Sequence, residues 1–405
     1  MLRTIKVVLC VFLLASTAVV LCGKEFNVAV ASLTAKEGLS WTFLHWLGAK
    51  IAQREGLVDN VVDILMTEAT AIADLSLLAS SGDYQLIVVV GWQFVPAVMQ
   101  VAAQFPKQYF MMTDITLPQH LPNVLNVLYR QEQPSAVVGA LAAALAVAYD
   151  MPYVGLVLGR EGAVLHEFEM GYKFGVDWAL NKLAETMPEV VQGKKIVAKP
   201  RQERVLWTYT GSFSDPALGR SATEAQVMQG AGVIYNVAGA TGLGIFSFID
   251  DYKRINNIPS HLPPFAIGVD LCQEWLSPNV ITSALKRADV AVKQAIKWIQ
   301  EGVFENIVRE NPVMWFSFEN GGMGVTTHET LKEFLDYAVA VKVLDEARIN
   351  EVINNWEKIR AAQPEWVWEI MESMYEAILK GEVELPRPFG DPLRWKIEDL
   401  RKYYG

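Results

Sequence analysis

Short apolar, β-branched runs alternate with helix-like stretches along most of the chain. Nine runs are predicted to be strands: Asn27–Ser32, Leu86–Val90, Tyr109–Met112, Val124–Leu128, Tyr153–Leu158, Val205–Tyr209, Gly232–Ala238, Phe265–Val269 and Val280–Ala284. Helices are expected between them, at Ser40–Glu55, Val95–Phe105, Ser135–Tyr149 and Glu167–Leu183. This alternation is typical of βαβ units with parallel sheets. The strands are almost continuously apolar, which indicates that helices cover both faces of each sheet.

The order of these elements predicts two α/β lobes. A fresh strand begins after Asp150-Met151-Pro152, which indicates a crossing between lobes, and the chain is expected to return to the first lobe after Asp270. The expected divisions are lobe 1 (residues 23–150 and about 272–305), lobe 2 (151–271 and about 306–328) and a helical C-terminal extension (329–405). The extension is charged, Trp-rich and helical in pattern, and we expect it to pack across the lobes. The cluster Pro386–Pro392 is expected to end its helices.

Length and composition agree with two sizeable folded domains. The 405 residues exceed one ordinary domain, and a hydrophobic content of 52% argues against disorder. The formal net charge is -10, and no basic stripe interrupts the acidic background. We therefore expect no nucleic-acid partner and no unspecific adhesion to anionic lipid.

The first 22 residues have the pattern of an export signal. Arg3 and Lys6 precede the apolar run Val7–Leu14, and small residues follow at 15–18. Cys22, after Val-Val-Leu, stands where a lipoprotein would be cleaved and lipidated, although that position before the cysteine normally takes Gly, Ala or Ser. Lipidation, plain cleavage and an uncleaved anchor remain open. Membrane attachment is expected only through this leader, and the mature chain is expected outside the cytoplasm.

Motifs of enzymes and metal sites are missing from the sequence. There is no GxSxG elbow, no HExxH and no Cys/His ligand spacing, and Cys272 is the single cysteine beyond the leader. We therefore expect no catalytic residue, no metal and no cofactor.

Ligands of open α/β sheets bind beyond the carboxyl ends of strands, where several polar and aromatic residues of this chain are expected. Phe213, in Gly-Ser-Phe-Ser-Asp-Pro, follows a strand, and the alternative is a buried ring beside a helix cap. Asp270 ends another strand, where a carboxylate accepts hydrogen bonds from a sugar diol. The alternative for Asp270 is an ion pair with Lys286, which is itself a candidate donor to a hydroxyl.

Two further segments carry candidate contacts. The loop from Gly239 to Gly242 lies between a strand and a helix, and its backbone N–H groups suit close approach to a ligand. Ser40 and Trp41 follow the first strand, and Trp92 follows Leu86–Val90. Rings at these positions suit stacking on a planar base, which is worth about 1–3 kcal/mol per base.

Together these segments resemble the basic membrane protein family, the solute-binding lipoproteins similar to the purine nucleoside receptor. The similarity covers about Phe26 to Pro386 and is strongest in YTGSFSDPALGRSATEAQVMQGAGVIYNVAGATGLGIF and FAIGVDLCQEWLSPNVITSALKRADVAV. The resemblance implies a type I periplasmic-binding-protein fold, with two doubly wound α/β lobes joined by three crossovers and a ligand in the cleft.

The resemblance also implies roles for single residues. Phe213 looks like the family's stacking ring, Asp270 its ribose-binding carboxylate and Lys286 its lysine. Asp114 looks like the acidic residue that ends a family strand, and Gly239 to Gly242 look like the backbone-contact loop. Two departures touch the base and sugar contacts: Gly38 stands where an acidic residue is usual, and Cys272 replaces the second acid of GVDxD.

The function expected from this resemblance is capture of a purine nucleoside or nucleobase for an ABC permease. An anchored sensor for a signalling partner is the first alternative. A nucleoside-cleaving enzyme is the second, and it lacks a clustered acid/base site in this sequence.

Overall fold

The computed structural model describes residues 25–405; the leader and Cys22 lie outside them. The strands are β1 (Asn27–Ser32), β2 (Asn60–Leu65), β3 (Leu86–Val90), β4 (Tyr109–Thr113), β5 (Val124–Tyr129), β6 (Tyr153–Leu158), β7 (Val205–Tyr209), β8 (Ala231–Val237), β9 (Phe265–Asp270), β10 (Val280–Lys286), β11 (Met314–Phe316) and β12 (Met323–Val325). The α-helices are α1 (Trp41–Arg54), α2 (Ala71–Ser81), α3 (Val95–Gln104), α4 (Glu132–Ala148), α5 (Ala163–Thr186), α6 (Pro188–Val191), α7 (Lys195–Ala198), α8 (Pro216–Met228), α9 (Leu243–Ile255), α10 (Ala288–Gln300), α11 (Phe304–Glu310), α12 (His328–Ala340), α13 (Ile349–Ala361), α14 (Glu365–Leu379) and α15 (Ile397–Tyr404).

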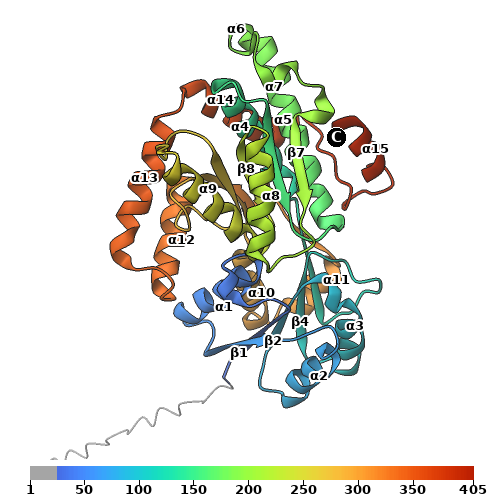
Figure 1. Cartoon of the computed structure of the whole chain (residues 1–405). Helices are drawn as coiled ribbons and strands as arrows, with labels where there is room; N and C mark the ends of the chain where they lie inside the picture. The colour runs from blue at the N-terminus through green and yellow to red at the C-terminus, as the bar shows by residue number, and fades with distance from the viewer. Residues whose placement is uncertain (1–24) are drawn as a thin grey trace, which may run out of the picture.

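Within the described residues the strands form two six-stranded sheets, one in each lobe (Figure 1). The first has the order β11-β5-β4-β3-β1-β2 and the second β12-β10-β9-β8-β6-β7. All neighbours are parallel except β10 and β12, which pair antiparallel. The predicted α/β class and type I periplasmic-binding-protein fold are confirmed.

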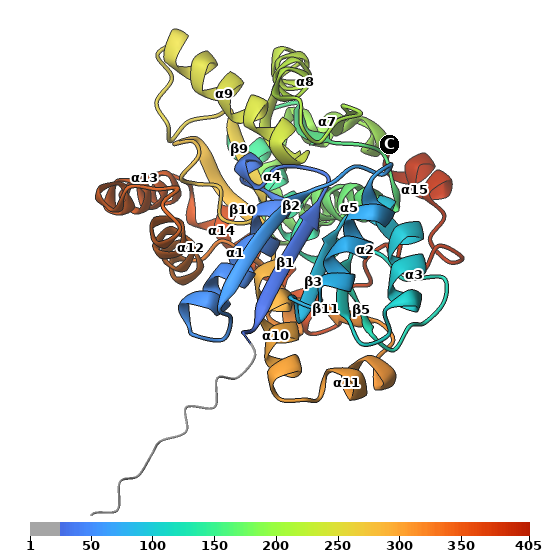
Figure 2. The same ribbon diagram turned by 90° about the horizontal axis from the view of Figure 1, so that it is seen from below.

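Apolar residues of the first sheet alternate between two helical layers. Val28, Val30 and Val88 pack with α1 and α10, whereas Ala29 and Ile87 pack with α2 and α3. Figure 2 shows the two helix pairs on opposite sides of these strands. Both faces are therefore covered, which explains why the strands are apolar throughout.

The predicted strands are present with small shifts, but three strands were not predicted. β2 is an edge strand whose residues are half-buried or exposed, and Asp63 interrupts its apolar run. β11 and β12 have three residues each, too few for a periodic pattern.

The chain changes lobe at places other than those predicted. Helix α4 packs against α5 and the second sheet, so the first crossing follows β5, near Arg130, and not Asp150. β10 pairs with β9, so the chain stays in the second lobe past Asp270 and crosses after Lys286. β11 belongs to the first sheet and β12 to the second, which makes the third crossing. Buried parallel strands look alike in sequence, and the local pattern therefore did not show which sheet takes each strand.

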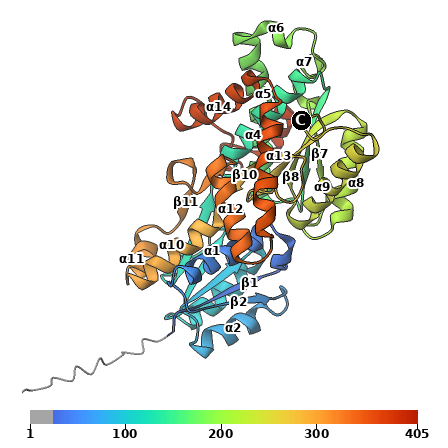
Figure 3. The same cartoon turned by 90° about the vertical axis from the view of Figure 1, so that its left-hand side faces the viewer.

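The C-terminal extension wraps around the second lobe. α12 and α13 run side by side along one flank (Figure 3), and α14 packs on α4 and α5. α12 also faces α1 of the first lobe, where Tyr337 and Leu47 line a common surface hollow. The expectation that Pro386–Pro392 ends the helices was wrong, because α15 follows it and packs beside α5.

Candidate ligand-binding site

The carboxyl ends of both sheets face one cavity of about 380 Å³. Ligand sites of small molecules are commonly about 300–1,000 Å³. Eight of the nine predicted binding residues line this cavity: Ser40, Trp41, Trp92, Asp114, Phe213, Gly239, Asp270 and Lys286. They follow or end strands of both sheets, so the parallel arrangement brings together residues that are far apart in sequence.

Gly242, the ninth, is not part of this lining. It is buried, and a side chain there would collide with Asn236. The Asn236 carboxamide accepts a hydrogen bond from the N–H of Ala238 at 3.0 Å, and its amide group donates to Gln273 at 3.1 Å. Glycine is therefore needed at position 242 for packing of the loop, while Gly239 faces the cavity.

Phe213 lies half-buried on the loop after β7. Its ring lies against Gly159, where a Cβ atom would collide with the ring carbons. The backbone N–H of Thr241 donates to the Phe213 carbonyl at 3.3 Å, and Asp215 caps α8 by accepting from Ala217 N–H at 2.9 Å. The cap and the cavity-lining ring, which the sequence left as alternatives, are both present.

Lys286 forms an ion pair across the two lobes. Its ammonium lies 2.6 Å from Asp114 Oδ1 and 4.1 Å from the centre of the Trp41 ring. Only 2% of the Lys286 side chain is exposed, so water screens this pair weakly. The alternative pairing of Lys286 with Asp270 is not what the structure shows: the partner is Asp114.

Asp270 and Asp114 place two carboxylates beside this ammonium. Both residues have positive φ, 68° and 63°, so the backbone turns sharply where β9 ends and just after β4. Burial raises the pKa of Asp270 to about 7, while Lys286 opposes that rise and Asp114 adds to it. Burial also raises the pKa of Asp114, against the attraction of Lys286. The cluster of Asp114, Asp270 and Lys286 thus offers two acidic groups and one cation to ligand hydroxyls.

Trp41 is held edge-on by two neighbouring rings. Its indole lies 4.5 Å from the His45 ring at 88° and 5.4 Å from the Tyr129 ring at 83°. Burial lowers the pKa of His45 to about 3, so its imidazole is neutral. His45 Nδ1 lies 2.8 Å from the Trp41 carbonyl oxygen. Because a carbonyl only accepts hydrogen bonds, Nδ1 carries the proton. His45 Nε2 therefore accepts a hydrogen bond from the Thr113 hydroxyl at 2.9 Å. His45 thus supports the Trp41 ring, although it was not among the predicted binding residues.

The second lobe adds cavity-lining residues that sequence reasoning missed. Arg160, after β6, places its guanidinium 5.8 Å from the centre of the Trp92 ring, which belongs to the first lobe. Phe168 on α5 and Phe389 in the extension add two more rings. No local motif marks these positions, since each contributes through the lobe arrangement.

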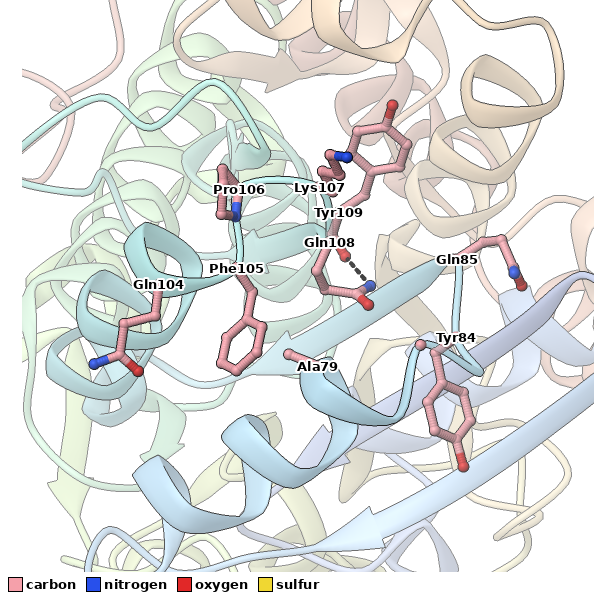
Figure 4. Close-up of a pocket in the computed structure, with 10 residues that line it drawn as sticks. Ala79, Tyr84, Gln85, Gln104, Phe105, Pro106, Lys107, Gln108 and Tyr109 are labelled. Carbon is pink, nitrogen blue, oxygen red and sulfur yellow. Dashed lines mark hydrogen bonds between the residues drawn. The ribbon is translucent and has the colours of Figure 1, made fainter.

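A second hollow, of about 520 Å³, lies at the other end of the first sheet (Figure 4). Tyr84 and Gln85 line it just before β3, and Gln104 to Tyr109 line it before and at the start of β4. It thus faces the amino ends of the strands, and Lys107 is its one charged lining residue. The lining of this hollow thus lacks the carboxylates that Asp114 and Asp270 bring, beside the Lys286 ammonium, to the inter-lobe cavity.

Two features are absent from residues 25–405. In that part of the chain no group of three or more His, Cys, Asp or Glu residues is arranged to hold a metal ion. Over the same residues, no helix has the length and apolar character needed to cross a membrane.

The family model described as ABC transporter substrate-binding protein, PnrA-like, matches residues 23–193 and 198–362. The chain belongs to this family. The PnrA-like relatives include an uncharacterised lipoprotein of Pyrococcus horikoshii, which is 29% identical over 94% of this chain and 89% of its own length. Another is a Lactococcus lactis protein named ABC transporter nucleoside-binding protein, 26% identical over 65% of this chain and 70% of its own.

A solved structure supports the same assignment. A solute-binding protein of an Aeropyrum pernix ABC transporter system matches with a TM-score of 0.76 and 27% identity, covering 93% of this chain and 98% of its own. The chain is thus an ABC transporter substrate-binding protein of the PnrA-like family. Members of such a family bind small molecules and deliver them to a permease.

Proposed function

We propose that the chain captures a purine nucleoside or nucleobase in the cavity between its lobes and passes it to an ABC permease. The observation that carries this proposal is the joint presence of aromatic walls and a charged cluster in one cavity. Trp41 and Phe213 supply rings, and Asp114, Asp270 and Lys286 supply the charges. A flat heterocycle attached to a sugar diol has matching chemistry.

Each part of a nucleoside has a partner in this proposal. Phe213 stacks on the base, because its ring is fixed against Gly159 while one side faces the cavity. Asp270 accepts hydrogen bonds from the ribose hydroxyls, and Lys286 donates to a hydroxyl oxygen. Gly239 and Ser40 offer backbone or hydroxyl contacts at the cavity edge. The Lactococcus relative, named nucleoside-binding, agrees with this ligand class.

Lobe closure retains the ligand in this proposal. Asp114 with Lys286, and Trp92 with Arg160, join the two lobes across the cavity. A ligand that bridges the same residues favours the closed arrangement, and hinge closure of this kind is how such proteins trap their ligands. The permease then recognises the closed protein.

Export and anchoring belong to the same proposal. We infer that the leader directs the chain out of the cytoplasm and that Cys22 carries a lipid, as in the relatives named lipoproteins. A Cys22→Ala variant would then lose the lipid mass and leave the membrane fraction, while an unchanged fractionation contradicts lipidation.

A thermal-shift panel tests the ligand class. Purified protein is unfolded and refolded to remove retained ligand, then incubated with inosine, adenosine, guanosine, adenine, ribose and leucine. We expect Tm to rise with the nucleosides or the base and to stay unchanged with ribose and leucine. Chromatography of the incubated nucleosides checks for turnover: release of free base would contradict a receptor, and a shift with leucine alone would contradict the purine assignment.

A further inference from the structure

The chain returns to the ligand cavity after α14. Leu385, Pro386 and Pro388 are buried, and Phe389, half-buried, lines the cavity together with Phe213 and Lys286. Every other residue of that lining comes from position 286 or earlier. Phe389 is therefore brought to the site by the C-terminal extension alone.

The backbone next to Phe389 is fixed to the start of α5. Gly390 N–H donates to Glu167 Oε1 at 2.7 Å, and Glu167 Oε2 accepts from Gln131 at 2.9 Å. Glu167 is fully buried, and its neighbour Phe168 also lines the cavity. A hydrogen bond to a buried carboxyl group is costly to break, so the backbone next to Phe389 is held at the start of α5.

Arg387 ties the same segment to the region where the chain crosses between lobes. Its Nε lies 3.4 Å from Glu132 Oε1 at the start of α4, and its guanidinium lies 4.7 Å from the centre of the Trp315 ring in β11. A side chain at Gly390 would collide with this guanidinium. The guanidinium would have to move to make room for such a side chain.

Helix α15, which follows Phe389 in the sequence, attaches the same segment to lobe 2 a second time. Arg401 donates to Glu161 Oε1 at 2.9 Å and to Glu169 Oε2 at 2.8 Å. Glu161 lines the cavity, and Glu169 is fully buried on α5. Figure 1 shows α15 and the C-terminus beside α5 and β7, on the flank opposite α13. We call residues 385–405 the C-terminal strap.

We propose that the C-terminal strap completes the ligand site and that Phe389 determines the size of the ligand accepted. This inference rests on the proposed function for the identity of the ligand. Hydrogen bonds and ion pairs attach the strap to lobe 2, at Glu167, Glu161 and Glu169, so it moves with that lobe when the cleft opens. Its contact with lobe 1, between Arg387 and Trp315, lies where the chain crosses between the lobes. Phe389 then keeps its place in the part of the ligand site that lobe 2 contributes, together with α5 and Phe213.

The test compares Phe389→Ala with Trp395→Ala. Trp395 is a partly buried aromatic residue of the same strap that does not line the cavity, so it controls for loss of a ring from the segment. Calorimetry measures binding of inosine and adenosine and of two enlarged nucleosides, N6-benzyladenosine and 5′-methylthioadenosine. Circular dichroism checks that both variants are folded.

We expect Phe389→Ala to weaken inosine or adenosine binding at least about fivefold and to strengthen binding of one enlarged nucleoside relative to wild type. Trp395→Ala should match wild type for all four. If Phe389→Ala also matches wild type, the strap inference is wrong while the proposed function stands. If wild type binds no purine of the thermal-shift panel but does bind ribose or leucine, the purine assignment is wrong. The effect of Phe389→Ala on binding of that other ligand then tests the strap inference. If nothing binds, both fall together.

Discussion

Lys286 Nζ lies 2.6 Å from Asp114 Oδ1 and 2.8 Å from Asp114 Oδ2, although Lys286 ends β10 of one sheet and Asp114 follows β4 of the other. Both residues were candidates from the sequence, but their pairing was not expected. The pair joins the lobes at the cavity itself. A ligand that contacts Lys286 more strongly in the closed arrangement than in the open one would therefore shift the equilibrium toward closed lobes.

Removing the ammonium should weaken ligand binding strongly. In Lys286→Met the ligand loses a donor and Asp114 stays buried without its partner. Truncating one member of a buried charged pair costs about 2–5 kcal/mol in binding, so we expect nucleoside affinity to fall about 30-fold or more. Calorimetry measures this, with Lys332→Met as the control, since Lys332 is an exposed lysine paired with Asp336 on α12. Equal affinities for the two variants would contradict a role for Lys286.

The raised pKa of Asp270 predicts a pH dependence of stability. Between about pH 4 and 7 the folded state keeps the Asp270 proton while the unfolded state releases it, so the free energy of unfolding should fall as pH rises through this range. The slope from one such group is about 1.4 kcal/mol per pH unit. His45, whose pKa is lowered to about 3, acts in the opposite direction between about pH 3 and 6.5. Urea unfolding of wild type and Asp270→Asn across pH 4–8 isolates the contribution of Asp270 as the difference between the two curves.

The same ionisation predicts proton release on binding. If the ribose hydroxyls donate to an ionised Asp270, binding below pH 7 requires loss of its proton, and affinity should rise as pH increases toward 8. Calorimetry at pH 6.5 in two buffers of different ionisation enthalpy measures the released proton. Asp270→Asn should release fewer protons than wild type; the same release from both would mean that another group titrates.

The contact between Gly159 and Phe213 predicts a sensitive position outside the binding residues. In Gly159→Ala the new methyl group collides with the Phe213 ring and pushes it from its place. We expect nucleoside affinity to fall about tenfold, since a displaced ring loses most of a stacking contribution of about 1–3 kcal/mol. Gly324→Ala is the control, because a Cβ there meets Leu285 at an ordinary 3.7 Å. A loss of affinity that is equal in both variants would count against ring displacement.

Much of the fold was predictable because buried parallel strands leave continuous apolar runs. β1, β3, β6 and β7 have the predicted bounds. Edge strand β2 escaped detection because Asp63 and exposed positions break its run. The lobe of β10 and the crossings near Arg130 and Lys286 depend on which strands pair, and a local pattern of hydrophobicity does not encode that.

The candidate site was predictable where a residue follows a strand. Asp270 and Lys286 stand at strand ends, so the general rule for α/β sheets located them, whereas Asp114 was proposed only from the family resemblance. Gly242 does not line the cavity. A glycine that permits packing against Asn236 looks the same in sequence as one that approaches a ligand. Phe389 escaped because it reaches the cavity only through long-range attachment of the extension.

The central claim, that a nucleoside base stacks on Phe213 in the inter-lobe cavity, is tested most directly by calorimetry of Phe213→Ala beside Phe105→Ala. Phe105 is also a half-buried ring, but it lines the hollow of Figure 4. We expect inosine or adenosine affinity to fall at least about tenfold in Phe213→Ala and to stay within about twofold of wild type in Phe105→Ala. Nucleoside binding that is equally tight in wild type and Phe213→Ala would contradict the claim.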